Sequence, residues 1–154
     1  MACQAHSGHA YDVAMSVFTK PEIDYLNSVT LGRMATIGRD GRPHLSPVTF
    51  VYNAAEDAID VGGIDFANTK KWRDARHNPN ITFIVDDFTG TSARAIEVRG
   101  DAEVHETGGS RINPRFPHFV EQFVRIRPRY IVAWGLDPET GMTPGGFKAN
   151  GRRV

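Results

Sequence analysis

The sequence predicts a mainly β fold with short helices, in which six mostly antiparallel strands close into a small barrel. Three observations indicate this: a hairpin pattern over residues 31–52, a clean alternation of apolar and polar side chains over residues 96–104, and 154 residues with 40% hydrophobic content, enough for one core. Closure removes sheet edges that would otherwise pair with other chains, so the barrel is favoured. An open α+β sheet is the alternative.

The helices are expected at three places. Thr19 and Glu22 have the spacing of a capping box, which predicts a first helix that ends near Asn27. A second helical pattern begins at Thr69, or at the residue before it, and stops before Pro79, since the residue before a proline disfavours the α region. A third, amphipathic helix is expected where apolar side chains recur at helical spacing, at Phe116, Phe119, Val120, Phe123 and Val124.

The hairpin over residues 31–52 carries the most informative feature of the chain. Its turn is indicated by Asp40-Gly41, where glycine tolerates the positive φ that tight turns demand. Its second strand, residues 43–53, contains Pro47. Because proline cannot donate a hydrogen bond to a neighbouring strand, Pro47 marks an edge, a bulge or a stretch of open backbone on which a flat ligand can lie.

The remaining strands are expected at residues 58–62, 81–85, 96–104 and 129–136. The domain organisation follows from composition. Residues 1–14 are small, polar and aperiodic and are expected to be a disordered extension, and residues 15–154 form one domain. Its tail, residues 138–154, is rich in glycine and is expected to be irregular.

Charge and cysteine content limit the function classes. Lys and Arg total 18 and Asp and Glu total 18, so no global field attracts nucleic acid or an anionic membrane. Cys3 is the only cysteine, so an internal disulfide is impossible and the cytoplasm is the expected compartment. The sequence shows no apolar run of about 20 residues for a membrane span and no metal-spaced set of Cys and His, so no metal site is predicted.

The densest positive charge lies in the second predicted helix, at Lys70, Lys71, Arg73, Arg76 and His77. Asp74 is the one acid among them. A solvated helix face explains such a run, but the free amides at the helix start add to the lysines in attracting phosphate or carboxylate. Gly62-Gly63 just upstream and Pro47 on the neighbouring strand shift the balance toward a flat slot with a cationic end.

Catalytic motifs are missing from the sequence. It contains no GxGxxG after a strand, no P-loop, no GxSxG elbow and no nucleophile beside a base, so no catalytic residue is assigned. If the protein is an enzyme, a bound organic cofactor must carry the difficult step.

Four segments, in order, carry a resemblance: RMATIGRDGRPHLSPVTFVY, NTKKWRDARHNPNITFIVDD, IEVRGDAEVHE and YIVAWGLDP. Together they resemble the pyridoxamine-5′-phosphate-oxidase-like split β-barrel superfamily. The similarity is strongest to the branch that uses the deazaflavin coenzyme F420 rather than flavin mononucleotide (FMN). It runs from about Val17 to Pro138.

The resemblance implies where a cofactor binds. The flavin or deazaflavin ring is expected on the hairpin strands, at Met34, Ala35, Thr36, Pro47, Val48 and Thr49. The phosphate is expected at Gly63, Ile64, Thr69, Lys70 and Lys71, with Lys71 as the family's phosphate-binding lysine. Arg73 and Arg76 are expected to reach the acidic tail that F420 has and FMN lacks. Family members are homodimers with cofactor at the subunit interface, so the Phe-rich helix and the tail are expected to contact the partner.

The implied activity is hydride transfer from C5 of the reduced deazaflavin to a conjugated small-molecule acceptor, with the proton coming from solvent. Two alternatives stay open: an FMN-dependent oxidoreductase or oxidase on the same barrel, and a non-enzymatic cofactor or haem carrier.

Overall fold

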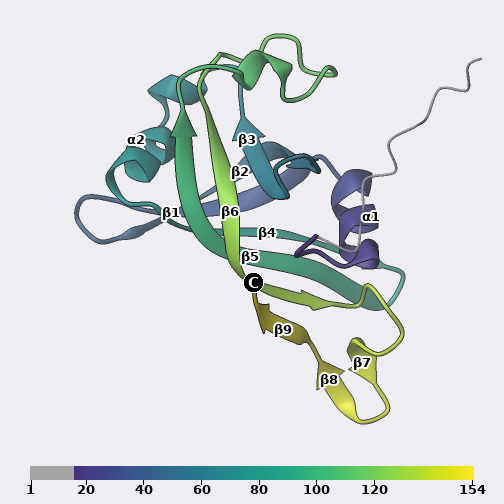
Figure 1. Cartoon of the computed structure of the whole chain (residues 1–154). Helices are drawn as coiled ribbons and strands as arrows, with labels where there is room; N and C mark the ends of the chain where they lie inside the picture. Colours follow the sequence, from purple (N-terminus) through teal and green to yellow (C-terminus); the bar gives the residue numbers. More distant parts are fainter. Residues whose placement is uncertain (1–15) are drawn as a thin grey trace, which may run out of the picture.

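In the computed structural model, which describes residues 16–154, six antiparallel strands close into a barrel (Figure 1). The strands are β1 (Leu31–Ile37), β2 (Pro43–Asn53), β3 (Ala58–Gly62), β4 (Asn80–Thr89), β5 (Ser92–His105), β6 (Phe123–Trp134), β7 (Gly141–Thr143), β8 (Gly146–Lys148) and β9 (Asn150–Arg153). Around the barrel the order is β3-β2-β1-β4-β5-β6, and β6 pairs back with β3. The six-stranded barrel is therefore confirmed, and the open sheet is wrong. The predicted extension, residues 1–14, lies outside the described residues.

The β1–β2 hairpin has the predicted turn. Gly41 has φ +76°, and the Gly38 amide donates to the carbonyl of Arg42 at 2.9 Å. Pro47 pairs with Arg33 of β1, but β3 pairs with β2 only from Thr49 onward. The first half of β2 thus has one strand neighbour among the described strands, and Pro47 lies on an open edge, as its missing amide requires.

Two α-helices, α1 (Lys20–Ser28) and α2 (Lys70–His77), lie on different sides of the barrel (Figure 1). In α1 the Glu22 carboxylate accepts a hydrogen bond from the Thr19 amide at 2.9 Å, which confirms the capping box. In α2 Thr69 is the N-cap, and its hydroxyl accepts from the Trp72 amide at 3.4 Å. Neither helix, nor any other in residues 16–154, has the length and apolar character to cross a bilayer.

The third predicted helix is wrong. Its segment follows the short 3₁₀ helix η3 (Gly109–Arg111) and consists of turns and irregular chain until β6 begins at Phe123. The end of the segment is extended instead, because Phe123 and Val124 pair with His105 and Val104 of β5. The other 3₁₀ helix, η2 (Phe66–Asn68), lies just before α2. The rings of Phe116 and Phe119 stack at 5.3 Å, and Phe119 covers Gly62, where a Cβ would lie 3.1 Å from its ring.

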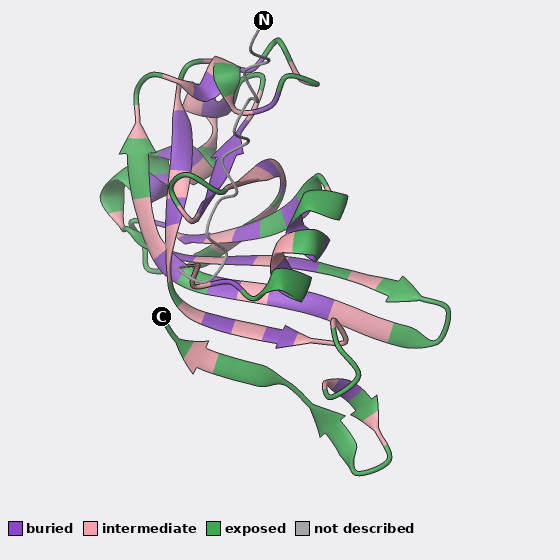
Figure 2. Cartoon of the chain, turned by 45° about the vertical axis from the view of Figure 1, so that its right-hand side comes forward, coloured by how far each residue is buried: buried purple, intermediate pink, exposed green. Residues whose placement is uncertain are grey.

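The tail predicted to be irregular instead contains β7, β8 and β9. Residues 59–61 of β3 cover only the start of β6, which leaves residues 130–133 of β6 with an open edge. β9 fills that edge, from Ala133 opposite Asn150 to Tyr130 opposite Arg153. Figure 2 shows that β8 and β9 nevertheless remain largely exposed. The pairing partner, and not local propensity, therefore orders the tail.

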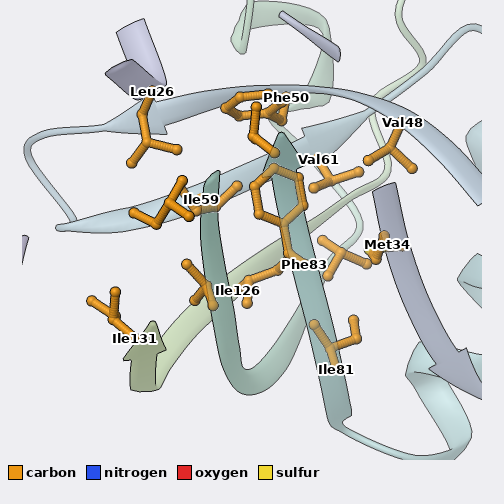
Figure 3. Packing of buried hydrophobic residues seen from close by; sticks show 14 of the residues in the cluster. Leu26, Met34, Val48, Phe50, Ile59, Val61, Ile81, Phe83, Ile126 and Ile131 are labelled. Carbon is orange, nitrogen blue, oxygen red and sulfur yellow. The ribbon is translucent and has the colours of Figure 1, made fainter. Parts of the chain in front are cut away.

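The core fills the barrel interior (Figure 3). The rings of Phe50 and Phe83 meet edge to face at 4.8 Å. Gly32 makes room for this pair, because a Cβ there would lie 2.5 Å from the Phe83 ring. Fully buried side chains around them include Leu26, Met34, Ile59, Val61, Ile126 and Ile131.

Candidate cofactor-binding site

A cationic cavity of 740 Å³ lies where the β1–β2 turn meets α2. Its lining residues are Arg39, Asp40, Lys70, Arg73, Asp74, Arg76 and His77. The structure therefore brings together three residues of the predicted site, Lys70, Arg73 and Arg76. Arg39 was missed by the sequence analysis. The feature that could have indicated Arg39 is its position in the tight turn. This turn approaches α2 so closely that a Cβ at Gly38 would lie 2.9 Å from Lys70 Nζ.

Asp74 organises the wall of this cavity. Its buried carboxylate accepts hydrogen bonds from Lys70 Nζ at 2.8 and 2.9 Å and from the Thr36 hydroxyl at 2.9 Å, and His44 Nδ1 lies 3.8 Å away. Burial by itself raises the pKa of Asp74, but the hydrogen bonds from Lys70 and Thr36 outweigh it, so that the pKa is lowered. Lys70 and Thr36 are thus joined to an internal anion that ties α2 to β1.

Lys71 differs from its neighbour. It lies outside the cavity and makes no hydrogen bond or ion pair with the described residues, and its Nζ lies 5.8 Å from the centroid of the Phe66 ring. Burial lowers the pKa of this half-buried lysine. An ammonium that loses water without gaining a counter-ion is unfavourable. An anion bound here would supply the missing partner.

Two of the other predicted phosphate residues, Gly63 and Thr69, also contact Phe66. Gly63 packs beside Phe66, since a Cβ on the glycine would lie 3.6 Å from that ring. The Thr69 hydroxyl donates to the Phe66 carbonyl at 2.6 Å. Ile64 is 69% exposed. Lys71, Gly63 and Thr69 therefore share one neighbourhood, distinct from the cavity that Arg73 and Arg76 line.

The predicted ring residues alternate between the two faces of the hairpin. Met34, Thr36 and Val48 are buried inside the barrel, so their side chains cannot contact a ligand on the outer face. Ala35, Pro47 and Thr49 point outward. Of this set, Pro47 lies on the open half of β2, Thr49 pairs with Gly62 where β3 begins to cover β2, and Ala35 lies on the neighbouring strand β1.

The donors at this junction fit a flat anionic cofactor. His44 Nδ1 and Ser46 Oγ are buried atoms of β2 without a hydrogen-bond partner among the described residues. These two atoms lie on the open half of β2, and the unpaired Lys71 ammonium lies beside Phe66. A polar ligand would satisfy such groups.

The barrel and its cationic helix place this chain among the split β-barrels. Residues 19–137 match the family described as pyridoxamine 5′-phosphate oxidase, and the chain belongs to that family. The family match stops before β7, so β7, β8 and β9 lie beyond it.

Individual relatives refine this assignment. The chain is 37% identical over 123 residues to the 5a,11a-dehydrotetracycline/5a,11a-dehydrooxytetracycline reductase of Streptomyces rimosus, covering 78% of this chain and 84% of the relative. It resembles the FAD-binding protein of Mycobacterium smegmatis with 25% identity and a TM-score of 0.56, covering 77% and 95% of the two chains. A haem-binding protein of the same organism shares the fold at 13% identity and a TM-score of 0.63, over 86% and 57%. The family and the reductase relative identify an oxidoreductase.

Proposed function

We propose that this protein is an F420-dependent reductase that passes a hydride to a conjugated small-molecule acceptor. The division of positive charge carries the proposal: Lys71 lies apart from the cavity that Arg73 and Arg76 line. One phosphate needs one such site. A cofactor with a phosphate and a further acidic tail makes use of both.

The chain's residues have separate roles in this proposal. Lys71 neutralises the phosphate beside Gly63 and Thr69. The outward residues Ala35, Pro47 and Thr49 receive the ring. Arg73 and Arg76 attract the acidic tail, and Arg39 across the cavity adds to their field.

When bound, reduced F420 supplies a hydride from C5 to the acceptor, which also takes a proton from solvent and so gains two electrons, while the deazaflavin is oxidised. The contribution of the protein is binding and orientation, which is where most of the rate arises in such reactions. No side chain of the site is assigned as a general acid.

The reductase relative supports the acceptor class, because its named substrates are dehydro compounds. We also propose that the protein is a cytoplasmic homodimer with the cofactor at the subunit interface. Leu31 and Leu45 on the outer face of the hairpin are 58% and 65% exposed, which is consistent with burial against a second copy.

A flavin is the second candidate. The FAD-binding protein of Mycobacterium smegmatis and a second FAD-binding protein, from Mesorhizobium loti, share this fold. A protein that is yellow when purified and keeps FMN through dialysis would favour this candidate and contradict F420.

The test is a pair of binding titrations, with F420 and with FMN, on the same protein. Lys71→Ala is expected to weaken both cofactors by roughly 1.5–3 kcal/mol, the value of a charged hydrogen bond, or about 10- to 150-fold. Arg73→Gln with Arg76→Gln is expected to weaken F420 and leave FMN unchanged. Lys148→Ala, an exposed lysine of β8, is the control and should change neither. Equal weakening of both cofactors by the double arginine variant would contradict the tail assignment.

A further inference from the structure

A second cationic pocket, of 500 Å³, lies on the outer face of the barrel and is lined by residues of β1, β4, β5, β6 and β9. One row of residues crosses five strands at this pocket. Ala35 of β1 pairs with Thr82 of β4, Thr82 with Arg99 of β5, Arg99 with Tyr130 of β6, and Tyr130 with Arg153 of β9. Residues directly opposite in antiparallel strands share a face, so all five line the pocket from one side.

The side chains of this row increase in size from β1 toward β6. Ala35 and Thr82 are short, so they form a low floor on which a flat molecule can lie. Tyr130 stands further along the row, between Arg99 and Arg153, with the Arg99 guanidinium 5.4 Å from its ring centroid. On β9 the chain has Gly151, where a Cβ would lie 2.8 Å from the Tyr130 hydroxyl. Tyr130 is thus held between an arginine and a bare stretch of backbone, and its ring forms a wall.

The three arginines of the pocket do not carry equal free charge. Arg99 is paired with Glu97, and Arg129 with Asp101 at 2.9 Å. Arg153 is exposed, and its side chain has no hydrogen-bond or ion-pair partner among residues 16–154. Its guanidinium is free to make the bidentate contact that carboxylates and other planar oxyanions accept.

The pocket adjoins the expected ring position, because Ala35 belongs to both. A hydride acceptor must stack over that ring, and the part of it that extends beyond Ala35 follows the row past Thr82, Arg99 and Tyr130 to Arg153 at its far end. We propose that this pocket binds the anionic end of the acceptor, so that the substrate class is a planar conjugated molecule bearing a carboxylate or enolate oxygen. The use of the pocket in turnover depends on the proposed function, whereas its ligand preference does not.

The experiment compares two redox-inert ligands of the same shape, 2-naphthoate and 2-naphthamide, by calorimetric titration of the full chain. We expect 2-naphthoate to bind at least tenfold more tightly. R153Q should reduce its affinity about tenfold and leave that of 2-naphthamide unchanged. K148Q removes an exposed lysine of β8 outside the pocket and serves as the control, with no effect expected on either ligand. An unchanged melting temperature checks that R153Q is folded.

Equal affinities for the two ligands, or 2-naphthoate binding that R153Q does not change, would overturn the proposal. A parallel F420 and FMN titration on R153Q separates it from the proposed function. Unchanged cofactor affinity with weakened 2-naphthoate binding supports a substrate pocket. Weakened cofactor affinity would mean that Arg153 holds the cofactor's own charged tail, and it would overturn the substrate assignment. Failure of the wild-type chain to bind either cofactor would contradict the proposed function alone.

Discussion

Arg152 donates hydrogen bonds to both carboxylate oxygens of Glu22, at 2.8 and 2.7 Å, and so ties the last strand of the chain to the first helix. The same guanidinium donates to the Val17 carbonyl at 2.6 Å. Glu22 is 1% exposed and also accepts from the Thr19 amide. A buried carboxylate with this many donors is fully satisfied, and it joins two segments that are distant in sequence, the start of α1 and β9.

Removing the guanidinium should therefore be costly. We expect Arg152→Ala to lower the free energy of unfolding by about 3–5 kcal/mol, because it leaves the Glu22 charge buried without its partner. Chemical denaturation followed by circular dichroism measures the change. Arg153→Ala, at the exposed neighbouring position, is the control and should change stability by less than about 0.5 kcal/mol. Similar losses in the two variants would contradict the role given to Glu22.

The two adjacent lysines of α2 should respond oppositely. Lys70→Met removes a donor from buried Asp74 and should destabilise the cofactor-free protein by about 1–3 kcal/mol. Lys71→Met removes an ammonium that has lost water without gaining a partner, so stability should stay unchanged or rise. Thermal unfolding of both variants at pH 7 makes the comparison. A large loss of stability in Lys71→Met would show that the lysine has a structural partner.

Asp74 should contribute to acid sensitivity. Its pKa in the folded protein is lowered from its ordinary value of 3.8, so the unfolded chain binds the proton more readily. The contribution is therefore present above pH 3.8 and is lost as the pH falls through the folded-state pKa. Asp74→Asn lacks it. The difference in melting temperature between wild type and Asp74→Asn should be constant from pH 7 to 5 and shrink below pH 4. A difference that grows on acidification would reverse this sign and refute the assignment.

Gly100 should tolerate no side chain. It lies at the irregularity in β5–β6 pairing, and a Cβ there would overlap the carbonyl oxygen of Arg127. We expect Gly100→Ala to lower the free energy of unfolding by about 1–3 kcal/mol through overpacking. Gly145→Ala is the control, because the nearest atom to its Cβ would be 3.8 Å away. Equal melting temperatures for the two variants would be the contrary result.

Local signals predicted the fold where they were strong. The Asp40-Gly41 turn, the Thr19 and Thr69 caps and the second and third strands all appear where the pattern places them. The Phe-rich segment misled because helical spacing of apolar residues does not exclude a turn followed by a strand. Phe123 and Val124 pair with His105 and Val104 of β5, a contact that no local pattern shows.

The candidate site was predictable as a region and not in its detail. The basic run over residues 70–77 indicated an anion site, but the predicted ring site did not separate the buried residues Met34, Thr36 and Val48 from their outward neighbours. Two adjacent lysines look alike in the sequence. Only the structure distinguishes Lys70, which pairs with Asp74, from Lys71, which pairs with no described residue. Arg39 enters the cavity because the turn approaches the helix.

By itself, the sequence determined the barrel class, the open edge at Pro47 and the cationic helix, because each depends on a backbone restriction or a charge encoded within a few residues. The tertiary structure alone decided which cations are free. It also ordered β9 on the open edge of β6 and so brought Arg152 to Glu22 and Arg153 to Tyr130. Those pairings join residues far apart in the chain, and their partners are chosen by the folded geometry of the barrel and not by local propensity.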